Sequence, residues 1–255
     1  MKRKKVRKSE SYVERTYRAL VDDDLFSCFV KIKDTDLHIQ ADQEVSDVAF
    51  DLALQFRLQI ETYIEQRPEF LPSLIPLAPD ILAPPIVKDM LAAGSMAGVG
   101  PMAAVAGAIA EYVGKALVHR GCREVMVENG GDIYCHRTEE CTVAIFAGQS
   151  PLSLQVGIKL PASMLPVGIC TSSGTVGHSL SFGKADAVAV IAQSSALADA
   201  VATRLGNEVD VASSADAGIK RALQVGQSIE GVQGVVVICG ESIGAVGNVE
   251  LVKLH

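Results

Sequence analysis

A carboxylate and a hydroxyl group lie four residues apart in the alanine-rich segment LADAVATRL, at Asp199 and Thr203. If this segment is helical, the two side chains share one face, with their Cβ atoms about 6 Å apart. Two oxygen ligands at that spacing can bind one hard cation such as Mg²⁺. The alternative is an ordinary helix with an exposed Asp199 and with Thr203 bonded to the preceding turn. Spacing alone favours that alternative.

A cluster of hydroxyl groups precedes this segment in the chain. Thr171, Ser172, Ser173 and Gly174 follow an apolar stretch that is typical of a strand. Loops at strand ends often carry ligand contacts, so we expect this loop to bind a phosphate or ribose group, although serine-rich loops also occur without function. His178, in the same loop, is a candidate catalytic residue that could orient or protonate a phosphoryl oxygen, or else a structural hydrogen-bond donor.

A glycine-rich turn, formed by Asn129, Gly130, Gly131 and Asp132, is a second candidate binding element. Glycines let backbone amides and carbonyls approach a ligand closely, and the neighbouring carboxylate adds negative charge suited to a cation. A hairpin turn with ordinary glycines accounts for the same four residues. Taken alone, the turn favours this second interpretation.

Cys170 directly precedes the hydroxyl-rich loop and is the candidate catalytic thiol among the six cysteines. A cysteine near a cation or a helix N-terminus can become a reactive thiolate, whereas a buried and inert strand residue is the favoured alternative. In a sulfur-assimilation role, Cys170, or less readily Cys122 or Cys135, would carry a persulfide. No C-x-x-C pair occurs, so neither a structural zinc site nor a disulfide is expected in a cytoplasmic chain.

Hydrophobic periodicity predicts long helices inserted among many short strands. The predicted helices are 44–66, 86–93, 102–118, 196–205 and 215–225. After strands within residues 11–40, the predicted strands are 124–128, 132–135, 142–147, 154–160, 167–171, 185–192, 235–239, 243–246 and 249–253. Strands and helices do not alternate strictly, and this order predicts an α+β fold with antiparallel sheets covered by long helices.

The expected organisation is a disordered basic tail at residues 1–10 followed by one domain at residues 11–255. Six of the ten prolines fall within residues 68–85, which predicts an extended, irregular crossing because proline is excluded from helix interiors. The glycine-rich residues 94–100 predict a flexible loop. Pro101 then marks a helix start, which serves either as a seat for an anion or as a site of close packing.

Composition and charge argue against several classes of partner. Tryptophan is absent and aromatic residues make up only 5% of the chain, which argues against a base-stacking nucleic-acid platform. Six of the 23 basic residues lie in the first eight positions, so the remaining 17 face 30 acidic residues and the body is strongly acidic. Nucleic acid and anionic membranes are therefore not expected as partners. No signal-like apolar segment is recognisable, and a cytoplasmic location is expected.

Four short motifs in register resemble the ApbE-like superfamily, the relatives of the thiamine-biosynthesis lipoprotein, which is an FAD-dependent protein flavin transferase. Asn129-Gly130-Gly131-Asp132 is similar to the family's N-x-G-G-[DE], and Thr171-Ser172-Ser173-Gly174 is similar to its A-T-S-G. Gly177-His178 lies where the family has S-H-I-x-D-P, and Ala198–Thr203 is similar to A-D-A-x-A-T. The resemblance covers residues 98–207, and the whole chain looks closer to a small uncharacterised cytoplasmic branch.

The resemblance implies an ApbE-like fold with Asp199 and Thr203 as Mg²⁺ ligands, joined by a backbone carbonyl near Asn129–Gly130. It also implies that the Thr171–Gly174 loop faces the phosphates of FAD or FMN. In the transferases, Mg²⁺ activates the pyrophosphate and FMN passes to a threonine of a target protein. This chain departs from the pattern after His178, where it lacks the family's Asp-Pro.

Three functions remain open on these grounds. The first is Mg²⁺-dependent binding of a small phosphate-bearing ligand, with flavin or nucleotidyl transfer. The second is an accessory role in sulfur assimilation, and the third is a non-catalytic binding or scaffold protein. A homodimer is compatible with alanine- and glycine-rich helices, which pack closely.

Overall fold

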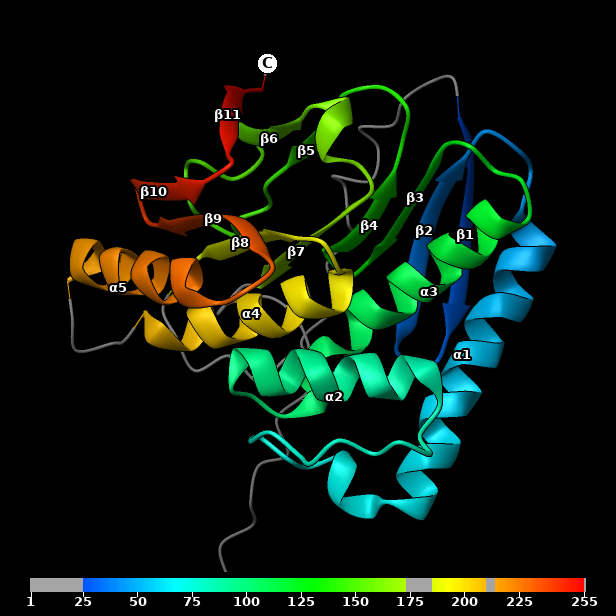
Figure 1. Ribbon diagram of the computed structural model, residues 1–255. Helices are drawn as coiled ribbons and strands as arrows, with labels where there is room; N and C mark the ends of the chain where they lie inside the picture. Colours follow the sequence, from blue (N-terminus) through cyan, green and yellow to red (C-terminus); the bar gives the residue numbers. More distant parts are fainter. Residues whose placement is uncertain (1–24, 173–184, 210–213, 255) are drawn as a thin grey trace, which may run out of the picture.

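The main layer of the fold is an eight-stranded sheet in the order β1-β2-β3-β4-β7-β8-β9-β10 (Figure 1). The computed structural model describes residues 25–172, 185–209 and 214–254. All neighbouring strands of this sheet pair antiparallel. The strands are β1 (Phe26–Ile32), β2 (Thr35–Ala41), β3 (Val125–Asn129), β4 (Asp132–His136), β7 (Val167–Ser172), β8 (Ala187–Ala192), β9 (Val232–Cys239) and β10 (Ser242–Gly247).

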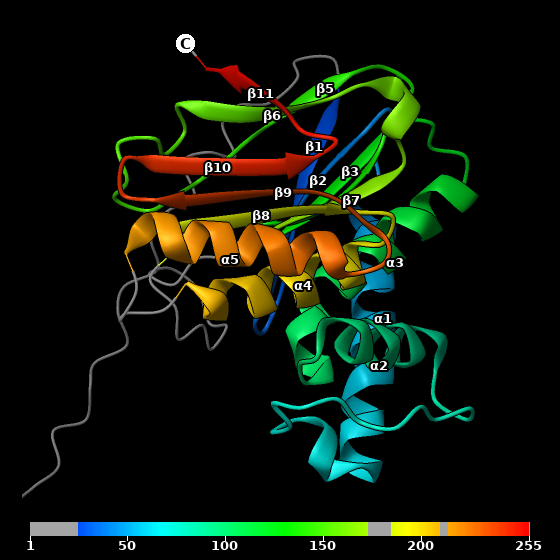
Figure 2. The ribbon, with the colours of Figure 1, turned by 60° about the vertical axis from the view of Figure 1, so that its left-hand side comes forward.

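Helices cover one face of this sheet, and a smaller sheet lies over the opposite face (Figure 2). The small sheet has the order β11-β6-β5. Its strands are β5 (Cys141–Ala144), β6 (Val156–Leu160) and β11 (Glu250–Lys253). The helices are α1 (Ser46–Gln66), α2 (Pro85–Ala97), α3 (Val105–His119), α4 (Ser195–Glu208) and α5 (Ala215–Ser228). The predicted α+β architecture, with antiparallel sheets covered by helices, is confirmed.

Two separate cores follow from this arrangement. The larger core lies between the helices and the main sheet, and β8 contributes to it and to the second core because its six residues are all buried. α1 presents Leu52, Phe56, Ile60 and Tyr63 to the larger core at the three- and four-residue spacing of an amphipathic helix. The second core fills the space between the two sheets.

The start of α3 and the end of α2 differ from the sequence expectation. α2 continues through Gly94 to Ala97, where residues 94–100 were predicted to form a loop. It ends at Gly98, which adopts a left-handed conformation with φ 73°. Gly94 lies within this helix. A Cβ there would lie 2.9 Å from the carbonyl oxygen of Val99, so glycine at this position permits the close return of the chain after the helix. Pro101 begins a 3₁₀ turn, and the α-helix itself starts only at Val105.

The segment Pro101–His119 is apolar and long enough to cross a membrane by length and composition alone. More than half of it, 56%, is buried within the fold. Its buried residues pack between α4 and the strands β3 and β4. This is the environment of a core helix, and such helices pass the same test.

α4 approaches β7 at a glycine. A Cβ on Gly168 would lie 2.4 Å from the Cα and backbone nitrogen of Ser195, the first residue of α4. Side-chain atoms could move away, but the backbone of a helix start cannot do so without displacing the helix. Glycine at this position therefore sets the distance between α4 and the sheet.

We predict that Gly168→Ala lowers the free energy of unfolding by about 3 kcal/mol, because the added methyl group overlaps the backbone of α4. Urea unfolding followed by circular dichroism measures this. Gly240→Ala is the matched control, since its site has φ 61° and no atom within 4 Å of the new Cβ. The control should cost about 1 kcal/mol through backbone strain alone. Equal costs at the two positions would contradict the close approach.

Candidate ligand site at the crossing of two helices

The Asp199 carboxylate lies at the N-terminus of α3. Its Oδ2 accepts a hydrogen bond of 2.9 Å from the backbone N–H of Gly107, and the N–H of Ala106 also donates to the carboxylate. The first N–H groups of a helix have no partner within the helix and carry a partial positive charge. The predicted anion seat at this helix start therefore exists, and the protein's own Asp199 fills it.

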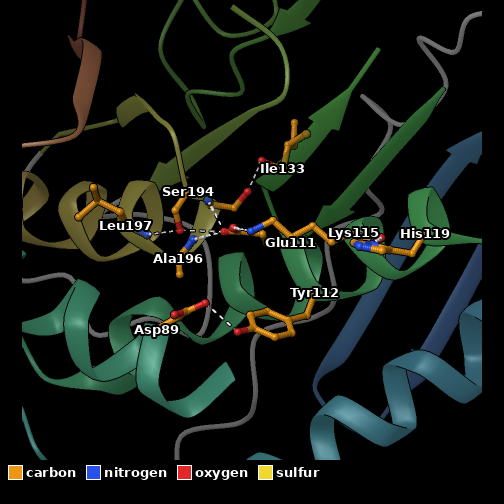
Figure 3. Close-up of polar contacts among 10 residues, drawn as sticks. Asp89, Glu111, Tyr112, Lys115, His119, Ile133, Ser194, Ala196 and Leu197 are labelled. Atoms are coloured by element: carbon orange, nitrogen blue, oxygen red, sulfur yellow. Dashed lines mark hydrogen bonds and ion pairs between the residues drawn. The ribbon is translucent and has the colours of Figure 1, made fainter. Parts of the chain in front are cut away.

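A second carboxylate makes the reciprocal contact, from α3 to the N-terminus of α4. Glu111, which is buried in α3, accepts hydrogen bonds at the N-terminus of α4 (Figure 3). Its Oε2 lies 2.7 Å from the backbone nitrogen of Ser195 and 2.8 Å from the Ser194 hydroxyl, and the N–H of Ala196 donates at 3.3 Å. Its Oε1 forms an ion pair with Lys115. Each helix thus caps the N-terminus of the other with a side chain from its own first half.

Close packing makes this reciprocal capping possible. A Cβ on Gly107 would lie 2.2 Å from the carbonyl oxygen of Ser195 and 2.9 Å from the Cβ of Asp199. Only a glycine lets the two helix backbones come this near. Both interpretations of the helix start, anion seat and close packing, therefore hold at once, at Ala106 and Gly107 rather than at Pro101.

The glycine-rich turn is joined to this crossing by a side chain. The Asn129 Nδ2 donates to the carbonyl oxygen of Ala106 at 3.1 Å. Gly130 and Gly131, both with positive φ, form the turn between β3 and β4, and the N–H of Gly131 donates to the Glu128 carboxylate. Asp199 contacts the backbone of Ala106 and Gly107, and Asn129 bonds to this same backbone through its side-chain amide.

The hydroxyl-bearing strand end lies beside the same turn. The N–H of Thr171 donates to the Gly131 carbonyl oxygen at 3.1 Å, and Asp132 stands opposite Cys170 across the β4–β7 pair. The Ser172 Oγ is buried and has no hydrogen-bond partner within the described part of the chain. A buried hydroxyl group without a partner is costly, so this atom is a candidate for contact with a ligand.

Thr203 is buried one turn beyond Asp199 in α4. The structure therefore brings Asp199, Thr203, the turn Asn129–Gly131 and the strand end Thr171–Ser172 to one region, around the start of α3. The other predicted site residues, Ser173, Gly174 and His178, lie outside the described residues. The described part of the chain includes no cluster of three His, Cys, Asp or Glu side chains able to hold a metal ion. A cation here would depend on Asp199, hydroxyl groups and backbone oxygens.

Burial raises the pKa of the Asp199 carboxyl to about 7, and the N–H groups of Gly107 and Ala106 oppose this shift only in part. Asp199 as a residue is only 7% exposed. No salt bridge to it is found among the described residues, in contrast to Glu111 with its Lys115 partner. A bound cation would supply the missing positive charge.

Cys170 is fully buried, and burial raises the pKa of its thiol well above the usual value, with the Asp132 and Asp199 carboxylates adding to the shift. Its Sγ donates to the Ser195 carbonyl oxygen. These features are the opposite of those of a reactive thiolate. They favour the structural interpretation and argue against Cys170 as a sulfur carrier.

Glu111 was missed by the sequence reading. In the stretch from Met102 to Val118, Glu111 and Lys115 are the charged residues, and they lie four apart in an otherwise apolar helix. Such a pair usually stands on a solvated face. Its position on the buried side of α3 depends on where α4 begins, and this is tertiary information. The signal was therefore present but could not be distinguished from an ordinary surface pair.

Another hollow, of about 860 Å³, lies between α1 and the proline-rich segment. Leu54 and Leu58 of α1 line it together with Leu82 and Pro84 of the proline-rich segment, and a Tyr63–Asp80 hydrogen bond closes one side. It contains none of the residues predicted from the motifs. The described motif residues Asn129, Thr171 and Asp199 lie instead where α3, α4 and the sheet meet.

Comparison with known sequences defines the class. A family described as AbpE bacteria matches residues 18–251, so the chain belongs to this family. A UPF0280 protein of Methanococcus aeolicus is 41% identical over 228 residues, covering 88% of this chain and 91% of the relative. A UPF0280 protein of Methanosarcina acetivorans is 40% identical over 220 residues, covering 86% of this chain and 85% of the relative. The chain thus lies in the UPF0280 branch of the family.

Solved structures show the same fold at low sequence identity. A mutant of the flavin transferase ApbE from Vibrio cholerae superposes with a TM-score of 0.56 at 14% identity, covering 87% of this chain and 96% of that one. The apo form of the flavinyl transferase ApbE from Pseudomonas stutzeri gives 0.56 at 13% identity, covering 89% and 95%. The predicted resemblance to the ApbE-like superfamily is confirmed, and so is its fold.

The pKa of Asp199 predicts a specific pH dependence of stability. Its folded-state pKa, about 7, lies above the ordinary value of 3.8, so between these values the folded chain binds more protons than the unfolded chain. The stabilisation is complete below the lower value and is lost as pH rises through the upper one. From pH 4 to 7, the wild-type chain should lose on the order of 4 kcal/mol relative to Asp199→Asn.

Urea unfolding of both proteins across this pH range, in buffer without divalent cations, checks the prediction. Asparagine keeps the size of the side chain and can still accept the N–H of Gly107. Stability curves that run parallel for the two proteins would show that Asp199 does not titrate in this range.

Proposed function

We propose that this protein binds Mg²⁺ together with a flavin nucleotide or a related phosphate-bearing ligand, and that it transfers the flavin or nucleotidyl group to an acceptor. The observation that carries the proposal is the Asp199 carboxylate, which is buried without a basic partner among the described side chains beside the turn Asn129–Gly131 and the strand end Thr171–Ser172. The ApbE fold favours a flavin over other nucleotides.

The residues at the site fit a hard divalent cation. Asp199 offers a carboxylate, and burial disfavours the charged form of this group. Thr203 offers a hydroxyl group one helical turn away. These two residues would hold Mg²⁺, with backbone oxygens near the start of α3 as further donors. When bound, the ion would stabilise negative charge that develops on the bridging oxygen of a pyrophosphate.

The remaining residues would position the ligand. The Gly107 N–H fixes the orientation of the Asp199 carboxylate, and Asn129 fixes the start of α3 by bonding to the Ala106 carbonyl. The two glycines of the turn leave room for close approach of a phosphate to the backbone. The unpartnered Ser172 hydroxyl would donate a hydrogen bond to a phosphate oxygen.

The flavin transferases with this fold suggest the finer details of the proposal. By the resemblance to the family, the acceptor would be a hydroxyl group of another protein. The cytoplasm is the location that the sequence leads us to expect. A homodimer would account for the exposed apolar side chains Ile81 and Leu82 of the proline-rich segment.

We predict that Asp199→Asn weakens Mg²⁺-dependent binding of FAD at least tenfold, because the variant removes the charge that holds the cation. Isothermal titration of the full chain with FAD, FMN and ATP, with and without Mg²⁺, measures this. Glu111→Gln is the matched control, since it alters the reciprocal carboxylate of the same helix pair and should change affinity less than twofold.

Equal losses in the two variants would assign Asp199 a purely structural role. Absence of Mg²⁺-dependent binding of FAD, FMN and ATP by the wild-type chain would overturn the proposal.

The reciprocal caps are the specific reason to consider a second candidate function, that of a non-catalytic scaffold. In such a scaffold, Asp199 would serve only to cap the N-terminus of α3.

We predict that Ser172→Ala leaves the free energy of unfolding unchanged or raises it by up to about 1 kcal/mol, because its buried hydroxyl has no described partner to lose. The same substitution should weaken binding of the phosphate-bearing ligand about tenfold. Thermal unfolding and titration with FAD plus Mg²⁺ give the two values. A variant that is destabilised but binds normally would place the hydroxyl in the fold and not in the site.

A further inference from the structure

Two cysteines lie side by side at the boundary between the two sheets, away from the crossing of α3 and α4. The Sγ of Cys135, in β4, is 3.6 Å from the Sγ of Cys141, the first residue of β5. Cys135 is completely buried in the core between the sheets, whereas Cys141 is partly exposed. We propose that this pair is a redox-sensitive site that forms an intramolecular disulfide by exchange with a low-molecular-weight disulfide.

The connection between the two cysteines is held in place by a single carboxylate. Glu124 accepts the backbone N–H of Thr138 at 3.0 Å and forms an ion pair with Arg137 at 3.2 Å. The residues between the two cysteines are therefore fixed against the start of β3. The two sulfurs lie side by side at the two ends of this connection. Bond formation requires the sulfurs to approach to about 2.05 Å, a movement of roughly 1.5 Å at the first residue of a strand.

The difference in exposure sets the order of the two steps. The Cys141 thiolate attacks one sulfur of the small disulfide, forms a mixed disulfide and releases one thiolate. Cys135 then loses its proton to solvent and attacks the Cys141 sulfur, which displaces the second thiolate. The pair loses two electrons and two protons in total, and the small disulfide is reduced to two thiols. The hydrogen bond with Cys141 and burial raise the pKa of the Cys135 thiol, in keeping with its place as the second nucleophile.

The consequence of this bond would be a covalent link between the two sheets. β4 belongs to the main sheet and begins at Asp132, directly after the glycine-rich turn, while β5 belongs to the small sheet. Cys135 is the next-to-last residue of β4, so the bond would link the sheets near the end of β4 that lies away from the glycine-rich turn. Disulfide formation at this pair depends on thiol chemistry alone and is independent of Mg²⁺ or flavin binding.

The test exposes the folded full chain to mixtures of oxidised and reduced glutathione, quenches with acid, alkylates the remaining thiols and maps the peptides by mass spectrometry. We expect a Cys135–Cys141 cross-link with loss of two hydrogen atoms. Cys135→Ala should accumulate one glutathionyl group on Cys141, and Cys141→Ala should leave Cys135 unmodified. Cys122→Ala, which removes another buried thiol, should form the cross-link as the wild type does.

Two results would overturn the proposal. One is separate alkylation of Cys135 and Cys141 in the wild-type chain at every glutathione ratio. The other is glutathione addition to Cys135 in the Cys141→Ala variant at the wild-type rate. The wild-type cross-link and the Cys141→Ala variant decide the matter even if alanine at the buried position 135 prevents folding.

Discussion

The reciprocal capping of α3 and α4 is the constraint on which the site depends. Asp199 of α4 binds the first N–H groups of α3, and Glu111 of α3 binds the first N–H groups of α4. A carboxylate at a helix N-terminus contributes up to about 2 kcal/mol when it is partly buried. Because both contacts depend on the same relative position of the helices, neither helix can slide along the other by a turn without both carboxylates losing their N–H partners.

The two halves of this arrangement are not equivalent. Glu111 has a lysine partner in its own helix, so its charge is balanced within the fold. Burial raises the pKa of Asp199, and its only described partners are backbone N–H groups. One carboxylate is thus satisfied by the protein, and the other retains an unmet demand for positive charge. This asymmetry separates a structural cap from a candidate cation ligand in a way that burial alone does not.

Most elements of the fold could be predicted from local patterns. The buried spacing along α1 and the apolar run of β8 identify these elements without any tertiary knowledge. The loop prediction was wrong for residues 94–97, because glycine and serine are typical of loops, whereas Gly94 lies in α2 and permits the close return of the chain at Val99. The candidate site residues were singled out by residue type and spacing and then by resemblance to the family's motifs. Pairing of β4 with β7 brings the turn Asn129–Gly131 beside the strand end at Thr171. The role of Glu111 could not be predicted, because nothing in the sequence places it against the start of α4.

The separation of these contacts along the chain has a consequence for the order of folding. Asn129 and Asp132 form a hairpin between adjacent strands, whereas Gly107 and Asp199 are 92 residues apart. Hairpins close in microseconds, and long loops must bear their closure entropy before distant contacts compensate for it. The glycine turn is therefore expected early and the capped helix pair late. A nascent chain can hold half of its sheet and still have no assembled site, so the chemistry appears only with the last long-range contacts.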